Sequence, residues 1–481
     1  MNLVLKPVLH VEARVKTNSD GLIIRTDLVG LAQFEFLSRC SAQKIRDEVA
    51  HWLVDKFAVL SLRQEIHSFD GLKEPHAQAL DSIVVTECSG EHFDSGAYRL
   101  QNVELDVQAY QLRVPVEDGF QPSQHTEESA DAGEDASKAK VVTLPSKELD
   151  GLWESLQYDQ PIQSTLLRAI TRMVLFSARR FNKWTINWNR LILLWGPPGT
   201  GKTSFCRGLA QKLAIRLGKH YPQSKLVDIN AQALGSKFYG ESGKLVGKMF
   251  DNIETLLEED DTFVCVFIDE IETLAARRER SLSGNEPFDA VRAVNALLTG
   301  LDKLRQHPNV VFICTSNLVT ALDPAFLDRV DIKQHMPHLS HRTMYELYKE
   351  CLEELSRCRI VEGASFDVIQ VNPDDPQTPL QYVEQPAAAL TLPSFDEMLL
   401  NFQMFPDAVP TRLADIASAS AVSIRSMTIR RLIVRQGISG RTVRRLPALS
   451  LVLHSNRSRC DIHEALEALR GGVEGERMEQ A

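Results

Sequence analysis

The segment from Leu191 to Ser204 joins an apolar run to glycine, lysine and hydroxyl residues of the kinds that bind phosphate. It fits the pattern Gly-x-x-x-x-Gly-Lys-Ser/Thr, in which glycines turn backbone N–H groups toward one point at a helix start. A glycine turn without a ligand is the alternative, but a strand-like run before it and helical spacing after it favour a phosphate loop. The predicted nucleotide contacts are Gly196, Pro197, Pro198, Gly199, Thr200, Gly201, Lys202, Thr203 and Ser204.

Two of these side chains have distinct predicted tasks. The Lys202 ammonium is expected beside the β- and γ-phosphate oxygens, and the Thr203 hydroxyl is expected to bind Mg²⁺. The segment therefore predicts a site for a nucleoside triphosphate with its metal ion.

A second apolar run, Phe263–Ile268, ends in two acids, Asp269 and Glu270. Such a run is typical of a strand buried on both faces, and acids at its end are typical of a Walker B motif. We predict that Asp269 holds Mg²⁺ and that Glu270 polarises the water that attacks the γ-phosphate. Two solvated acids capping a strand are the alternative, which the upstream phosphate loop disfavours.

The third buried run, Val310–Cys314, leads into Asn317, which resembles the sensor 1 residue of AAA+ ATPases and is expected to position the water. Farther on, Leu322–Asp331 looks like the AAA+ segment that carries the arginine finger. A finger reaches the γ-phosphate held by a neighbouring subunit, and Arg329 is the candidate. The alternative is an ion pair of Arg329 with Asp328 or Asp331 on its own surface.

Between the two Walker motifs lies an aromatic loop with Lys237, Phe238 and Tyr239. In AAA+ unfoldases the loop at this position lines the central pore, where a ring side chain grips an extended peptide. The alternative is that both rings pack under a surface loop. The position between the Walker motifs favours a substrate pore loop.

Composition and charge exclude several classes of protein. The chain has 481 residues, of which 43% are hydrophobic, enough for about three domains. Its net charge of −10 argues against a general nucleic-acid coat. No apolar run approaches the roughly eighteen residues of a membrane span, and Lys6, Glu12 and Arg14 come too early in the chain for a signal peptide. We expect no membrane association and a cytosolic or nuclear location. Eight cysteines without a Cys-x-x-Cys pair indicate reduced thiols.

Shifts in composition divide the chain into four parts. We predict an N-terminal α+β domain at 1–116, an acidic flexible linker at 117–143, an ATPase domain at 144–338 and a helical lid at 339–475. The predicted fold class is α/β, an AAA+ P-loop core with a parallel sheet and flanking helices beside the lid and the N-terminal domain. The proline-rich stretch 361–393 is interpreted as a loop insertion in the lid.

An arginine-rich region follows between residues 411 and 460, with Asp415 as its one acid. Within it, Gly437–Arg441 precedes a helix at the position where AAA+ lids present sensor 2, so Arg441 is expected to contact the nucleotide and couple its state to the lid angle. For the other arginines we favour pairing with acids of the next protomer over contact with DNA phosphates.

Four motifs together resemble one family, the pachytene-checkpoint AAA+ ATPases. They are Gly-Leu-Trp-Glu-Ser-Leu at 151–156, the aromatic loop at 236–246, the segment 290–302, and Gly-Ile-Ser-Gly-Arg at 437–441. The resemblance is strong over about 145–340, moderate over 400–470, and rests on length and strand content in the N-terminal domain. Two features depart from it: Phe238 stands where many relatives have tryptophan, and the proline-rich insertion has no counterpart.

The resemblance implies a homo-hexamer that uses ATP and Mg²⁺ to convert HORMA-domain proteins from a closed to an open form. It implies roles at meiotic chromosome axes and in silencing the spindle checkpoint, in the nucleus and cytoplasm, with residues 1–116 binding the client or a HORMA adaptor. Direct nucleic-acid binding is not expected. Two alternatives remain open: a nucleic-acid motor or clamp-loading subunit that uses the arginines, and a scaffold that binds ATP without hydrolysing it.

Overall fold

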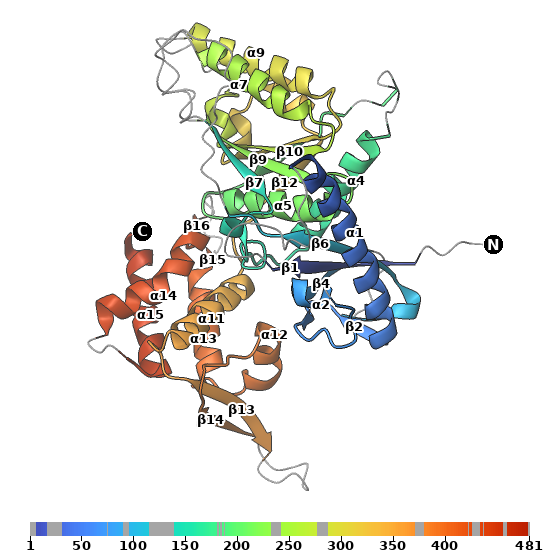
Figure 1. Cartoon of the computed structure of the whole chain (residues 1–481). Coiled ribbons are helices and arrows are strands. Elements are labelled where there is room, and N and C mark those ends of the chain that lie inside the picture. The colour runs from blue at the N-terminus through green and yellow to red at the C-terminus, as the bar shows by residue number, and fades with distance from the viewer. Residues whose placement is uncertain are drawn as a thin grey trace, which may run out of the picture. The chain divides into compact units, whose positions relative to one another are not determined.

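The computed structural model of the chain contains two compact units (Figure 1). The first unit consists of Met1–Trp153, Ile162–Trp195 and Thr203–Gln334, and the second of Glu154–Pro161, Gly196–Lys202 and His335–Ala481. The structure describes residues 6–16, 31–74, 76–89, 96–114, 139–179, 182, 185–186, 188–231, 242–276, 287–370, 380–421, 423–425, 433–435, 437–455 and 459–479.

The N-terminal domain is an α+β structure built on β1 (Val8–Val15). This strand pairs antiparallel with β4 (Leu80–Ser89) and parallel with β6 (Glu104–Gln111), and β3 (Glu65–Ile66) completes the sheet at the β4 edge. A long helix, α1 (Leu31–Lys56), contacts β6 (Figure 1). Alternating apolar residues of β1 supply the core, because successive side chains of a strand point to opposite faces.

The ATPase sheet has the strand order β12-β8-β11-β10-β9-β7. Its central strands β8 (Leu191–Trp195), β11 (Val310–Ser316), β10 (Thr262–Asp269) and β9 (Gln223–Asn230) are mutually parallel. Strands β8, β10 and β11 are almost wholly buried, which explains their continuous apolar runs. Because parallel strands end at the same edge, the polar residues that follow β8, β10 and β11 are brought together there.

Four helices belong to this part of the first unit: α4 (Ile162–Ser177), α5 (Lys202–Leu217), α7 (Ser242–Leu257) and α9 (Pro287–Leu304). Helices α7 and α9 lie side by side (Figure 1). Gly300 of α9 permits their close approach, since a Cβ there would lie 2.3 Å from the Phe250 ring. The edge strand β12 (Ile332–His335) pairs with β8, and the short helix α10 (Pro324–Arg329) precedes it.

The C-terminal boundary predicted for the linker is wrong. Residues 139–143, assigned to it from the sequence, belong to β7 (Ala139–Leu144), which pairs antiparallel with β9. Val142 and Leu144 are buried and supply apolar contacts that make it a strand. On the other side of residues 115–138, Arg113 pairs with the ATPase domain: its N–H donates to Pro145 O at 2.8 Å, and its carbonyl accepts from Lys147 N–H at 2.9 Å.

The second unit contains the lid helices α11 (His341–Arg357), α13 (Val409–Ser420), α14 (Gly440–His454) and α15 (Ile462–Glu479). They bury one apolar cluster that includes the two tyrosines Tyr345 and Tyr348. The short helix α12 (Phe395–Glu397) begins with a capping box at Ser394, and the π-helical turn Met398–Phe402 follows it.

The proline-rich stretch 361–393 is not the irregular loop expected from the sequence. Its strands β13 (Ala364–Gln370) and β14 (Leu380–Pro386) pair antiparallel throughout. Among the described prolines, Pro386 is the last residue of β14 and Pro393 lies beyond it, where a missing N–H does not break the ladder. Alternation of Phe366 and Val368 with polar residues allows Phe366 to stack on Tyr382 of the partner strand.

Short elements complete the described chain: β2 (Val59–Ser61), β5 (Ala97–Arg99), α2 (His76–Ala79), β15 (Ser423–Arg425), β16 (Ile433–Arg435), and 3₁₀ turns at Leu100–Asn102, Lys147–Leu149, Ile271–Thr273 and Val319–Ala321. Within the described ranges, no helix combines the length and apolar character needed to cross a bilayer.

Candidate functional site

The loop between β8 and α5 has the backbone of a phosphate loop. Gly196, Gly199 and Gly201 all adopt positive φ, at 154°, 76° and 84°, which residues with a Cβ rarely do. Two of them also lack room for a side chain: a Cβ at Gly196 would lie 2.2 Å from Met336 O, and one at Gly199 would lie 2.4 Å from the Ser439 Cβ. The sequence pattern is therefore explained by backbone geometry and by close packing in the second unit.

The Lys202 ammonium lies within this loop, where it donates to the carbonyls of Gly196 and Pro197 at 2.8 Å each. Thr200 is buried, and its hydroxyl donates to Pro197 O at 3.1 Å, which closes the turn. Pro198 lines a pocket together with residues of the segment 437–442. Ser204 lies in the first turn of α5. The loop thus places one cation and the N-terminus of α5 at one point, as phosphate binding requires.

In the first unit, the helix start meets the acids at the end of β10. The Thr203 hydroxyl lies 2.9 Å from Asp269 Oδ2 and 3.2 Å from Oδ1. Hydroxyl and carboxylate oxygens are ligands that Mg²⁺ prefers. The two residues that the sequence predicted as metal ligands are therefore adjacent, and their chemistry fits that ion.

Glu270 is held in an unusual backbone conformation, with φ 51° and ψ 52°. For a residue with a Cβ this left-handed geometry costs roughly 1–2 kcal/mol. The backbone N–H of Glu270 donates to the Thr315 hydroxyl at 3.0 Å, and that hydroxyl in turn bonds to Asp269. Asn317 lies exposed at the end of β11, and its backbone N–H donates to Glu272 Oε1 at 3.0 Å.

Arg329 pairs within its own chain, but not with either acid considered from the sequence. Its guanidinium makes a two-pronged contact with Asp302 of α9 at 3.1 and 2.9 Å and donates to Ala325 O. This contact holds the pKa of the Asp302 carboxyl below its usual value. Asp331 is instead engaged by the backbone N–H groups of Asn189 and Leu191, at 2.9 and 3.1 Å.

Arg441 is exposed in the first turn of α14, the helix that meets the phosphate loop. Ser439 caps this helix by accepting from Thr442 N–H at 3.2 Å, and Gly440 N–H donates to Gly199 O at 2.9 Å. The segment predicted as sensor 2 is thus hydrogen-bonded directly to the loop backbone. The pore-loop residues Lys237, Phe238 and Tyr239 lie outside the described residues, so that assignment stays a prediction.

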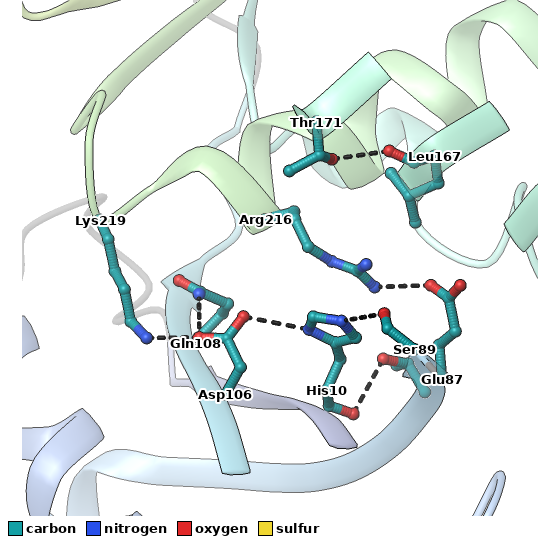
Figure 2. A network of polar contacts seen from close by, with 10 residues as sticks. His10, Glu87, Ser89, Asp106, Gln108, Leu167, Thr171, Arg216 and Lys219 are labelled. Carbon is teal, nitrogen blue, oxygen red and sulfur yellow. Dashed lines mark hydrogen bonds and ion pairs between the residues drawn. The ribbon is translucent and has the colours of Figure 1, made fainter. Parts of the chain in front are cut away.

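The N-terminal domain docks on the C-terminal half of α5 through charged side chains. Lys212 pairs with Glu12 of β1 at 2.7 Å, and both side chains are only 8% exposed. Arg216 pairs with Glu87 of β4 at 2.9 Å. Asp106 of β6 accepts from His10 and from Lys219, the residue two positions after α5 (Figure 2). Burial opposes ionisation of Asp106, but these two donors outweigh it and keep its pKa below the ordinary value.

Several of these residues were missed by sequence reasoning. Each charge of the docking surface stands alone in the sequence, and its partner is on another element, as with the 200 positions between Glu12 and Lys212. A lone charge in an amphipathic stretch looks like a solvated residue. Thr315 gave a weak signal, since it follows a buried strand at the edge where the Walker B acids also lie.

Comparisons with known proteins agree with this architecture. Three family models match successive parts of the chain: the TRIP13 N-terminal domain over residues 4–115, the AAA model (ATPase family associated with various cellular activities) over 192–338, and the TRIP13-like AAA+ ATPase lid C-terminal domain over 340–477. The matches, together with the phosphate loop and the adjacent acids, define an AAA-family ATPase with its own N-terminal and lid domains.

The relatives are pachytene checkpoint protein 2 homologs. The human homolog is 38% identical over 393 residues, which cover 82% of this chain and 80% of that protein. The rice homolog is 40% identical over 326 residues, which cover 68% of this chain and 63% of that protein. The match to the Arabidopsis homolog covers 45% of the length of that homolog. The solved structure of C. elegans PCH-2 superposes with a TM-score of 0.65 at 27% identity, covering 98% of this chain and 99% of that one. The chain belongs to the pachytene checkpoint protein 2 family.

Proposed function

We propose that this ATPase works as a homo-hexamer that converts HORMA-domain proteins from the closed to the open form and so disassembles their complexes. The proposed settings are meiotic chromosome axes and spindle-checkpoint silencing, in the nucleus and cytoplasm, with a HORMA adaptor where the client needs one. Support comes from family membership across the N-terminal, ATPase and lid domains.

The observation that carries the proposal is the docking of the N-terminal domain on α5. This helix begins at Lys202 of the phosphate loop and contacts β1 and β4 of the N-terminal domain through Lys212 and Arg216. A client bound to that domain is therefore linked to the nucleotide site through one continuous helix, as a remodeller requires.

The proposed chemistry assigns each site residue a task in ATP hydrolysis. Lys202 binds the β- and γ-phosphates, while Glu270 takes the proton of a water that Asn317 helps to orient. Mg²⁺, held by Thr203 and Asp269, would supply charge neutralisation at the phosphates.

Arg329 has a task in the hexamer that it cannot perform within its own chain. As an arginine finger it would leave Asp302 and reach the nucleotide of the neighbouring subunit, where its planar charge stabilises the transition state. Arg441 would respond to the loss of the γ-phosphate, and the resulting lid movement would let Phe238 and Tyr239 pull on a client peptide.

The second candidate function is a nucleic-acid motor or clamp-loading subunit, and it requires lid arginines that can contact nucleic-acid phosphates. Three of them pair with acids of the same chain instead: Arg412 with Glu467, Arg445 with Glu476, and Arg444 with Glu350. Of the predicted arginine cluster, positions 430, 431 and 457 lie beyond the described ranges. For these three arginines the paired acid lies in the same chain, whereas from the sequence we expected it on the next protomer.

A trapping experiment tests the proposal. The Glu270→Gln variant should bind ATP but hydrolyse it at least about 10²-fold more slowly, because the general base is lost. We expect it to retain an identified HORMA-domain protein from a nuclease-treated extract in the presence of ATP and to release it with ADP.

The Lys202→Ala variant is the matched control, since it should bind neither nucleotide nor client. Recovery of replication or repair proteins alone, in a nuclease-sensitive manner, would contradict the proposal and favour the nucleic-acid motor. Full ATP turnover by the Glu270→Gln variant would show that Glu270 is not the general base.

A further inference from the structure

The Thr315 side chain connects the two Walker B acids. It is 1% exposed, lies near the end of β11, and comes one position after Cys314, which pairs in register with Ile268 of β10. Its hydroxyl donates to Asp269 Oδ1 and accepts from the backbone N–H of Glu270 at 3.0 Å. A hydroxyl has one donor and two acceptor sites, so both bonds can exist together.

Each of these two hydrogen bonds restrains one of the neighbouring acids. The Asp269 carboxylate also contacts the Thr203 hydroxyl, so the bond from Thr315 fixes its rotation from the opposite strand. Glu270 is in the left-handed region, where a residue with a Cβ stays only when its surroundings hold it. The bond to its N–H is a contact from a separate strand that supports this conformation.

The geometry points to Thr315 as a positioning residue for ATP hydrolysis: it fixes the backbone of Glu270 relative to Asp269 and thereby aims the Glu270 carboxylate at the attacking water. The inference rests on ATP hydrolysis at this site and is independent of the client. Thr315 acts through Glu270 and does not hold the phosphates, so its loss affects turnover more than nucleotide binding.

Two matched pairs of proteins isolate the hydroxyl. Wild type and Thr315→Val have nearly the same shape, and Thr315→Ser and Thr315→Ala both lack the methyl group; each pair differs by the hydroxyl. We expect kcat to fall about 10²-fold from wild type to Thr315→Val, since small displacements of a catalytic group cost about this much. A similar fall is expected from Thr315→Ser to Thr315→Ala, with Thr315→Ser itself within about threefold of wild type.

Binding and stability are measured on the same proteins. Affinity for a fluorescent ATP analogue, with Mg²⁺ and with a chelator, should change by less than about threefold, and KM likewise, because the phosphate loop is untouched. Thermal melting shows which variants are folded. If Thr315→Val does not fold, the Ser and Ala pair decides the question.

The control is Thr299→Val on α9, where the exposed hydroxyl donates to Asn295 O of its own helix, at 2.9 Å. This variant should match wild type in kcat. Equal kcat within both pairs would overturn the inference, and so would a loss of nucleotide affinity as large as the loss of kcat. Failure to capture a HORMA protein would leave these results unaffected, so the two proposals fail separately.

Discussion

At the scale of single residues, the glycines of the phosphate loop differ in what constrains them. Gly201 has about 3.2 Å between its would-be Cβ and the Tyr158 hydroxyl, whereas Gly199 faces the Ser439 side chain at 2.4 Å. Gly199 also accepts the hydrogen bond from Gly440 N–H. Gly199 therefore belongs to the phosphate-binding backbone and also holds the first residue of α14 through this hydrogen bond.

The Gly199→Ala variant should bind ATP at least tenfold more weakly. The added Cβ would have to displace Ser439 and would occupy a left-handed conformation, which costs roughly 1–2 kcal/mol. Titration with a fluorescent ATP analogue and a thermal melt measure both effects. Gly247→Ala is the control, since nothing lies within 4 Å of its Cβ and alanine should stabilise α7 by about 0.8–1.0 kcal/mol. Normal binding by the Gly199→Ala variant would contradict this account.

At the scale of elements, α5 has two ends with different contacts. Its first residues belong to the nucleotide site, and its last turns carry Lys212 and Arg216, which hold the N-terminal domain. A buried ion pair stabilises little beyond a well-packed apolar replacement, but breaking it leaves an uncompensated charge. The buried pair of Lys212 with Glu12 therefore determines where the N-terminal domain docks more than it adds to the free energy of unfolding.

Glu12→Leu should lower the free energy of unfolding by about 3–5 kcal/mol, because it removes the carboxylate that pairs with the buried Lys212 ammonium. The double variant Glu12→Leu with Lys212→Met should recover most of that loss. Urea denaturation of both singles and the double gives the coupling energy. Lys140→Ala provides the control: its pair with Glu148 is 64% and 49% exposed, so less than about 1 kcal/mol is expected. A double variant as unstable as Glu12→Leu would show that the pair does not determine docking.

Prediction from the sequence succeeded where the functional residues lie close together along the chain. The phosphate loop and the Walker B acids are short motifs, and buried parallel strands have an apolar signature, so the ATPase core was predicted correctly. Contacts between distant elements gave no such signal. Asp302, the partner of Arg329, lies 27 positions away on α9, and the charges of the docking surface are indistinguishable from solvated residues in the sequence. The hairpin β13–β14 was missed because the prolines around it outweighed the alternation within it.

At the scale of the whole molecule, the proposed hexamer predicts that two inactive variants can complement each other within one ring, which monomers could not do. The Arg329→Ala variant should lose about 10³-fold in ATP turnover, the lower range for removal of an arginine finger. Mixing it with the Glu270→Gln variant, which is also impaired in ATP turnover, should restore part of the activity. Some interfaces then combine an intact Arg329 from one subunit with an intact Glu270 from the next.

The control is a mixture of the Glu270→Gln variant with the double variant Glu270→Gln and Arg329→Ala, in which no subunit has Glu270, so it should stay inactive. ATPase rates of the mixtures and sedimentation of each protein are measured together. Absence of complementation in rings that form normally would show that Arg329 acts within its own subunit, where it contacts Asp302.

The pairing of Arg113 with Pro145 and Lys147 has a consequence for sequence change over evolution. These backbone hydrogen bonds, at 2.8 and 2.9 Å, join the chain just before the segment 115–138 to the residues that follow β7. The entropy of closing a segment rises only slowly with its length, so insertions and deletions there alter the folded state little. Changes in that segment's length should therefore cost little stability, while the placement of the N-terminal domain on α5 depends on residues outside it, such as Glu12 and Lys212.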